Sequence, residues 1–232
     1  MTNLSEFIFG DREDLFQQLE RDVMGKLQDG ILKHGKASML LSGGTTPGPL
    51  YERLSGQKFD WEKVWFSLTD ERWVDRDNPQ SNEKLIRETL LKNEAKAAHL
   101  IGLKSEGADV VVGQIKTDEK LSDLPLPSEL VLLGMGEDGH IASLFPGLEN
   151  TKEAMDISNK NLCQAIIREG GEIPRISMTL SALLDTKHIF LLFFGAKKKK
   201  VFERAKKIKT ANLPVSFLLH QHRVPVSLYF AE

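Results

Sequence analysis

Residues Leu130 to Gly147 have the sequence LVLLGMGEDGHIASLFPG. The four apolar residues at the start are typical of a strand that is buried on both faces, and the glycines that follow end this strand abruptly. Glu137, Asp138 and His140 then place three titratable side chains close together. In an α/β protein, a strand that leads into such a loop is where the chemistry is usually found. Taken alone, this loop could equally be a plain glycine turn with solvated acids.

The composition limits the class of protein. The chain has 232 residues, of which 41% are hydrophobic, and a formal net charge of -2. This length is enough for one large or two small domains, and because no linker divides the chain we expect a single domain over residues 1–232. The near-neutral charge gives no sign of nucleic acid or a membrane surface as a partner. No stretch approaches the ~18 apolar residues that a membrane span needs.

Cysteine content and the start of the chain bear on the compartment. Cys163 is the single cysteine, which excludes an internal disulfide and a multi-cysteine metal site. The first residues, MTNLSEFIFGDRED, have no basic region followed by an apolar core, as a secretory signal would. We therefore expect a soluble cytoplasmic protein.

Apolar strands alternate with helical patterns along the chain. The expected strands are 7–9, 37–41, 64–68, 99–103, 130–133, one within 161–167, 175–180, 188–194 and 224–230. Helices are expected between most of them, including 108–121 and one that starts at 196, and Ser181 is expected to cap a short helical turn. This alternation predicts an open, mostly parallel, Rossmann-like α/β sheet with helices on both faces.

The parallel sheet has a consequence for function. Because the carboxyl ends of parallel strands lie along one edge, the loops at Ser42, Asp70, Gly134 and Gly195 should converge there. The first of these loops, SGGTTP at 42–47, combines glycine N–H groups, hydroxyls and a helix start, and this combination is typical of anion-binding loops. It is not a Walker loop, since no Lys follows the glycines, and it could also be a tight turn with hydroxyl caps.

Charged side chains follow two more of these strands. Asp70, Glu71 and Arg72 could orient a polyol substrate, or they could form a surface ion-pair cluster. Four lysines, 197–200, come soon after Gly195. Most of these lysines must face solvent, and one near the helix start could reach a ligand over the sheet edge.

Together and in this order, these motifs resemble the 6-phosphogluconolactonases, within a wider superfamily of sugar-phosphate isomerases and deaminases. The matching motifs are LSGGTTP (41–47), SLTDERWV (67–74), NPQSN (78–82), LLGMGEDGHIASLFPG (132–147), PRISMTLSAL (174–183) and FFGAKK (193–198), and they cover nearly the whole chain. The ASLFPG tail is similar to the lactonase branch, because the deaminase loop resembles DGHIAFNEP, with a glutamate where this chain has Leu144 or Phe145. Deaminases also tend to have DEY where this chain has DER at 70–72.

The resemblance implies which residues bind the substrate. The phosphate or nearby hydroxyls would be cradled by Ser42, Gly43, Gly44 and Thr45 and neutralised by Arg175 and Lys198. Lys198 is preferred because it completes a G-x-x-K pattern from Gly195, with Lys197 as the alternative. Arg175 begins a strand, where the parallel topology does not place it at the active edge, so its assignment depends on the resemblance alone.

The implied reaction is hydrolysis of 6-phospho-D-glucono-1,5-lactone to 6-phosphogluconate, the second step of the oxidative pentose phosphate pathway. A lactone is an activated ester, so this reaction needs a deprotonated water, a stabilised carbonyl oxygen and a proton for the ring oxygen. Our hypothesis is that neutral His140 activates the water and Arg72 or glycine N–H groups stabilise the oxyanion. Asp138 or Asp70 would orient the imidazole or the sugar hydroxyls. No metal or other cofactor is expected, and the partner is a small sugar-phosphate lactone.

Two alternatives remain. An aldose–ketose isomerase and deaminase of amino-sugar phosphates would use Asp70 to abstract a carbon-bound proton. A non-catalytic sugar-phosphate sensor would normally carry a DNA-binding segment, and only a few residues precede the first expected strand here.

Overall fold

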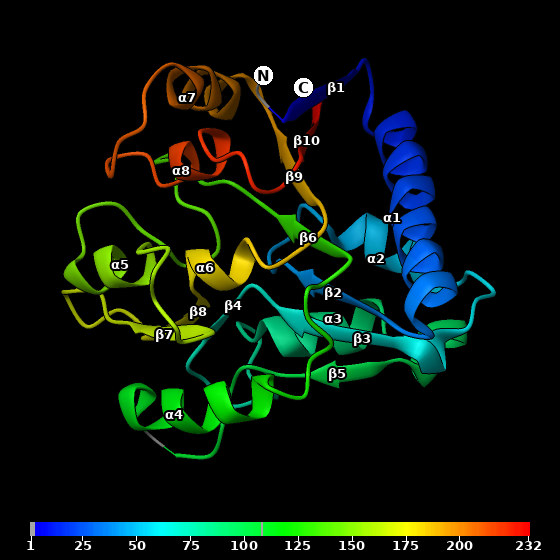
Figure 1. The fold of residues 1–232 in the computed structure, drawn as a ribbon, viewed down its shortest axis with the longest axis horizontal. Helices are drawn as coiled ribbons and strands as arrows, with labels where there is room; N and C mark the ends of the chain where they lie inside the picture. The colour runs from blue at the N-terminus through cyan, green and yellow to red at the C-terminus, as the bar shows by residue number, and fades with distance from the viewer. Residues whose placement is uncertain (1–2, 108) are drawn as a thin grey trace.

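The computed structural model describes residues 3–107 and 109–232, which form two sheets (Figure 1). In spatial order, the seven strands of the main sheet are β1 (Leu4–Phe9), β10 (Val226–Ala231), β9 (Ile189–Phe194), β6 (Leu130–Leu133), β2 (Ala37–Leu41), β3 (Val64–Leu68) and β5 (His99–Ile101). Every adjacent pair in this sheet is parallel. The predicted mostly parallel sheet is therefore confirmed.

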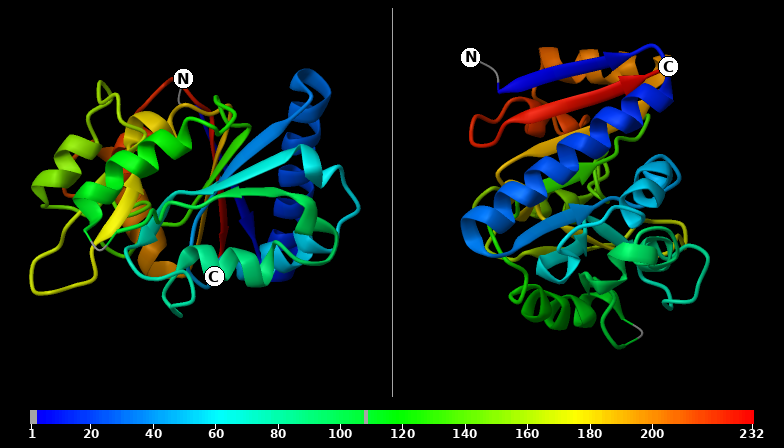
Figure 2. Two further views of the ribbon diagram at one scale, coloured as in Figure 1. Left: turned by 90° about the horizontal axis from the view of Figure 1, so that it is seen from below. Right: turned by 90° about the vertical axis from the view of Figure 1, so that its right-hand side faces the viewer.

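Helices cover both faces of the main sheet, as predicted. The α-helices are α1 (Arg12–His34), α2 (Gly48–Ser55), α3 (Asn82–Thr89), α4 (Val110–Leu121), α5 (Glu149–Ala154), α6 (Leu180–Leu183), α7 (Ala196–Lys207) and α8 (Val215–Leu219), and two 3-10 turns are η1 (Trp61–Lys63) and η2 (Asn93–Ala97). With the sheet seen on edge in Figure 2, α1 and α2 lie on one face and α4 to α7 on the other. None of the helices in residues 3–107 and 109–232 combines the length and the hydropathy that a membrane-spanning helix needs.

The strand order changes direction at the centre of the main sheet. From β2 the chain continues to β3 and β5 on one side, whereas from β6 it continues to β9 and β10 on the other. Ligands of open α/β sheets bind at such a switch point, outside the carboxyl ends of the strands. The four loops that were expected to converge follow β2, β3, β6 and β9, which are neighbours here.

A second sheet was not predicted. It contains β4 (Asp70–Arg72), β8 (Arg175–Met178) and β7 (Cys163–Ile166), all antiparallel. Residues 70–72 were expected to be a loop, but after Thr69 the chain leaves the main sheet and pairs with β8. The main-chain N–H of Met178 donates to the carbonyl of Thr69 (2.8 Å), which joins the two sheets at this corner.

Two local expectations also need correction. The short helix α6 is capped by Thr179, whose Oγ1 accepts the N–H of Ala182, and not by Ser181. A hydroxyl at the last extended residue is in the position to cap, whereas Ser181 already lies inside the helix. The helix expected over 108–121 is present as α4, but Ala108 lies outside the described residues.

Candidate active site

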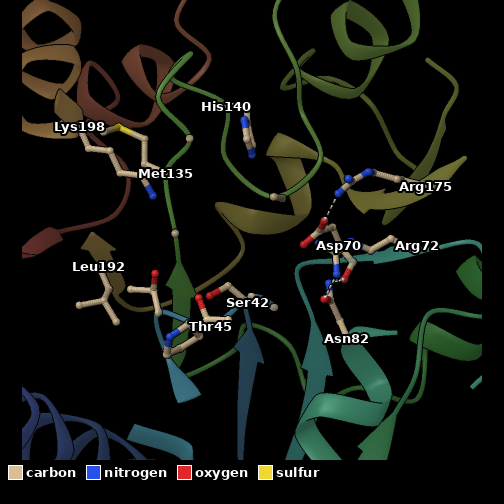
Figure 3. Close-up of a pocket in the computed structure, with 17 residues that line it drawn as sticks. Ser42, Thr45, Asp70, Arg72, Asn82, Met135, His140, Arg175, Leu192 and Lys198 are labelled. Carbon is tan, nitrogen blue, oxygen red and sulfur yellow. Dashed lines mark hydrogen bonds and ion pairs between the residues drawn. The ribbon is translucent and has the colours of Figure 1, made fainter. Parts of the chain in front are cut away.

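A cavity of about 300 Å³ lies at the carboxyl ends of β9, β6, β2 and β3 (Figure 3). Its wall contains nearly all the residues proposed from the sequence, namely Ser42, Gly43, Gly44, Thr45, Asp70, Arg72, His140, Arg175 and Lys198. Asp138 does not line the cavity and instead contacts His140. The expected convergence of the four loops is therefore observed. Of the proposed residues, Asp138 is the one that does not line the cavity.

The second sheet explains how Arg175 reaches this cavity. Alternate residues of a strand point to the same face, so Asp70 and Arg72 of β4 face one way and Glu71 the other. Arg175 of β8 is directly opposite Arg72 across the antiparallel pair, which puts both side chains on the cavity face. An Arg175 guanidinium nitrogen lies 3.9 Å from Oδ2 of Asp70. Topology therefore does place Arg175 at the site, through a sheet that the sequence did not predict.

Hydrogen bonds fix Asp70 and Arg72. The carboxylate of Asp70 accepts the hydroxyl of Ser143, and both residues are buried. Arg72 donates from the same guanidinium nitrogen to Oδ1 of Asn82 and to the carbonyl of Gln80, both at 2.9 Å. Asn82 in turn donates to the carbonyl of Asp70 (2.8 Å). Arg72 is thus held in one position at the rim of the cavity by neighbours that carry no charge.

Glu71 binds the main chain of α3, although the sequence analysis grouped it with Asp70 and Arg72 as a possible substrate-orienting residue. Its carboxylate is buried and accepts the main-chain N–H groups of Asn82 and Glu83, at the start of α3, both at 2.7 Å. Burial raises the pKa of Glu71, and these N–H groups with that of Arg72 and the hydroxyl of Ser81 act in the opposite direction. Glu71 therefore anchors α3, and with it Asn82, rather than facing a substrate.

His140 and Asp138 form a pair within one loop. Nδ1 of His140 lies 2.6 Å from Oδ1 of Asp138, and the hydrogen bond with His140 lowers the pKa of Asp138 to about 2. The imidazole also packs against the ring of Phe145, with 4.5 Å between the ring centroids. Because Asp138 occupies Nδ1, Nε2 is left for the cavity, into which the ring points (Figure 3).

Glycines allow the close approaches at this site. A Cβ on Gly136 would lie 2.2 Å from Nδ1 of His140, so the ring fits only above a glycine. A Cβ on Gly43 would lie 1.9 Å from Oδ1 of Asn82, which means that the Ser42 loop packs directly on the residue that holds Arg72. Gly44 has a φ of 84°, a conformation that side chains other than glycine rarely adopt.

The lysine run presents one side chain to the cavity. Lys198 lines the wall from the first turn of α7 (Figure 3), whereas Lys197 is exposed. Lys199 faces away and pairs with Glu6 (3.0 Å) and Glu203 (3.1 Å). Of the two lysines that the sequence left open, the structure brings Lys198 to the site.

Three residues near the site were missed by the sequence reasoning. Asn82 was considered only as a helix cap, and Ser143 belonged to a motif in which it had no assigned role. Arg168 stacks on Phe145, with 4.3 Å from its guanidinium carbon to the ring centroid, and the same ring lies 5.2 Å from that of Arg175. The NPQSN and ASLFPG motifs contained the first two, but no spacing pointed to Arg168.

The chemistry of the wall suits an anionic ligand. Arg72, Arg175 and Lys198 line the cavity, with Asp70 as the one carboxylate. The Ser42 loop adds glycine N–H groups and hydroxyls next to the start of α2. No group of three or more His, Cys, Asp and Glu side chains that could hold a metal ion occurs in the described part of the chain.

Comparison with known proteins identifies the family. Residues 10–227 match the family model described as glucosamine-6-phosphate isomerases/6-phosphogluconolactonase. A protein of Caulobacter vibrioides named 6-phosphogluconolactonase is 36% identical over 97% of this chain and 96% of its own length. One of Pseudomonas putida with the same name is 34% identical over 95% of this chain and 90% of its own.

Solved structures show the same relationship. The crystal structure of a 6-phosphogluconolactonase from Shewanella baltica superposes with a TM-score of 0.94 at 34% identity, over 99% of this chain and 98% of that one. A monomeric glucosamine-6-phosphate deaminase has a TM-score of 0.78 at 17% identity, which shows a shared fold alone. The chain therefore belongs to the glucosamine-6-phosphate isomerase/6-phosphogluconolactonase family.

Proposed function

We propose that this protein hydrolyses 6-phospho-D-glucono-1,5-lactone to 6-phosphogluconate. The observation that carries the proposal is that His140, held by Asp138 at 2.6 Å, shares one cavity with three cationic side chains and the Ser42 loop. A general base beside an anion cradle is what the hydrolysis of a phosphorylated ester requires. The relatives that are 31–36% identical over nearly the whole chain bear the name 6-phosphogluconolactonase, which supports the same substrate.

The phosphate of the substrate would bind in the cavity beside the Ser42 loop. Ser42, Gly43, Gly44 and Thr45 would donate to its oxygens, and Lys198 and Arg175, on opposite sides of the cavity in Figure 3, would neutralise its charge. Phosphate contacts do not change during the reaction, so they contribute position and affinity. Their purpose would be to hold C1 of the lactone within reach of His140.

The chemical step follows from the geometry of the pair. Neutral His140 would accept a proton from water at Nε2 while the water oxygen forms a bond to C1. The carbonyl oxygen then carries the negative charge, which Arg72 or the glycine N–H groups would stabilise. Collapse of this intermediate breaks the bond between C1 and the ring oxygen, and the imidazolium returns the proton to that oxygen. General acid–base catalysis of this kind is worth roughly 10²- to 10⁴-fold.

Asp138 would act on His140 and not on the substrate. Its ionised carboxylate would keep the proton of the neutral imidazole on Nδ1, so that Nε2 is the basic nitrogen, and would stabilise the imidazolium that forms. Asp70, which accepts from Ser143 and lies beside Arg175, would instead orient the sugar hydroxyls. Every proton in this route is carried by His140, so the route that we propose is metal-independent.

Assay of the purified protein with freshly prepared 6-phosphogluconolactone tests this function. We expect release of 6-phosphogluconate well above the spontaneous rate. Glucosamine 6-phosphate is the comparison substrate, and ammonia release from it without lactone hydrolysis would favour the deaminase instead. Tight binding of a sugar phosphate with no turnover of either substrate would favour a sensor.

A further inference from the structure

A second cavity, of about 900 Å³, lies between α4 and the segments that follow β4 and β5. Four cationic side chains line it, namely Arg76, Lys104, Lys116 and Lys120, together with two carboxylates, Asp75 and Glu106. None of these residues lines the active-site cavity. Pockets of about 300–1,000 Å³ are typical of sites for small molecules.

The lysines of this cavity form no ion pair with a carboxylate in the described part of the chain. Within residues 3–107 and 109–232, neither Lys104, Lys116 nor Lys120 takes part in an ion pair. The amine of Lys104 donates to the carbonyls of Ser105 (3.0 Å) and Gly107 (2.8 Å) and lies 4.0 Å from the ring centroid of Trp73. Burial lowers the pKa of both Lys104 and Lys120. The charges of Asp75 and Glu83 act in the opposite direction on Lys104 and Lys120, respectively, but within the described residues they form no ion pair with these lysines, which are thus partly removed from water.

Several other half-buried lysines of the protein form ion pairs. Lys187 pairs with Glu129 at 2.6 Å, and Lys199 pairs with Glu6 at 3.0 Å. Lys198, in the wall of the active site, resembles the lysines of the second cavity, because it forms no ion pair among the described residues. Of the half-buried lysines without an ion pair among the described residues, Lys104, Lys120 and Lys198 line a cavity, whereas the amine of Lys26 lies 3.1 Å from Nε2 of His188.

We infer that the second cavity binds the phosphate group of a small phosphorylated molecule, at a site separate from the active site. Lys116 and Lys120 would contact the phosphate, because the amine of Lys104 already donates to two main-chain carbonyls, whereas that of Lys120 makes one long hydrogen bond, to the carbonyl of Lys104 at 3.4 Å. The carboxylates of Asp75 and Glu106 would accept hydrogen bonds from hydroxyls of the same molecule. The segment 73–81 connects the two sites directly, because it begins after Arg72 and ends before Asn82, both in the wall of the active site.

Trp73 provides a signal for binding. Its ring is buried under Lys104, and its indole N–H has no hydrogen-bond partner among residues 3–107 and 109–232. In a ¹⁵N-labelled sample, the indole resonance can be assigned by its loss in Trp73→Phe. Inorganic phosphate would then be titrated at constant ionic strength, with chloride replaced by phosphate. We expect a shift of this resonance that saturates.

Variants decide whether the shift comes from this cavity. Lys116→Gln/Lys120→Gln should weaken the apparent affinity at least about tenfold, the loss expected for one charge-assisted hydrogen bond. The control Lys58→Gln/Lys96→Gln removes the same charge at exposed positions elsewhere and should leave the titration unchanged. Lys116→Glu, at an exposed position, is a second variant that should also weaken binding without disturbing the fold.

Three outcomes would overturn the inference. The first is a shift that rises linearly and equally in wild type and Lys116→Gln/Lys120→Gln, which would be a general salt response. The second is a saturating shift that disappears in Lys198→Ala, because phosphate would then be binding in the active site. The third is the absence of any shift. Retention of the saturating shift in Lys198→Ala is the expected result.

Discussion

Nδ1 of His140 lies 2.6 Å from Oδ1 of Asp138, and the main-chain N–H of His140 donates to the same oxygen at 3.1 Å. One carboxylate oxygen therefore fixes both the ring and the backbone of the residue two positions later. The hydrogen bond lowers the pKa of Asp138 to about 2, so this carboxylate is ionised at neutral pH. The loop after β6 carries a base together with the acid that orients it.

The first prediction concerns Asp138→Asn. Asparagine has nearly the same shape, but its amide does not hold a proton on Nδ1 as a carboxylate does. We expect kcat for the phosphorylated lactone to fall about 10²-fold. KM should change little, because Asp138 does not line the cavity. Steady-state kinetics would measure both values, and a kcat close to that of the wild type would show that Asp138 does not position His140.

The lowered pKa of Asp138 also predicts how stability depends on pH. Because the pKa in the folded state is below the unfolded value of about 3.9, the ionised carboxylate stabilises the fold above that pH. This contribution is lost as the pH falls toward about 2. Asp138 is nearly half exposed, so the effect should be below about 1 kcal/mol. Urea unfolding of wild type and Asp138→Asn should show a larger difference at pH 6 than at pH 3; a difference that grows on acidification would contradict this.

Gly136→Ala tests how closely the pair must be held. Its new Cβ would lie 2.2 Å from Nδ1 of His140 and 2.5 Å from Oδ1 of Asp138, so the pair must move. A displacement of about 1 Å can cost about 10²-fold in rate, and we expect kcat to fall by that order. The matched variant is Gly134→Ala, in the same loop and also in the cavity wall, where a Cβ would meet no atom of the described residues within 4 Å and the loss should be much smaller. Equal losses in the two variants would show that any methyl group in this loop is harmful.

The lysine run allows a matched test of phosphate binding. Lys198→Ala removes a cation from the cavity wall, and Lys197→Ala removes its exposed neighbour. A charge-assisted hydrogen bond is worth about 1.5–3 kcal/mol, which predicts that Lys198→Ala raises KM roughly 10- to 150-fold for the phosphorylated lactone. KM for unphosphorylated gluconolactone should not change. If Lys197→Ala raises KM more than Lys198→Ala does, then Lys197 and not Lys198 contacts the phosphate.

The main sheet could be predicted because its strands are buried on both faces. Runs such as 130–133 and 189–194 are continuously apolar and stop at glycines, which is typical of the central strands of a parallel sheet. Once the strands were taken as parallel, the convergence of their loops followed from geometry alone. The order of the strands, and with it the switch point between β2 and β6, had no signal in the pattern.

The second sheet could not be predicted for physical reasons. Strand β4 contains three charged residues, Asp70 to Arg72, and is too short to show an alternation. Its pairing with β8 is a tertiary contact between segments about a hundred residues apart, and no local propensity determines such a register. For the same reason, the sequence could not separate Glu71, which anchors α3, from its two neighbours that face the cavity.

The central claim is that His140 activates the attacking water, and His140→Ala tests it most directly. The measurement is kcat for freshly prepared 6-phosphogluconolactone, corrected for spontaneous hydrolysis, with retention of the fold checked by circular dichroism. We expect a loss of roughly 10²- to 10⁴-fold with KM nearly unchanged, since the phosphate contacts remain. A folded His140→Ala variant with an undiminished kcat would contradict the account.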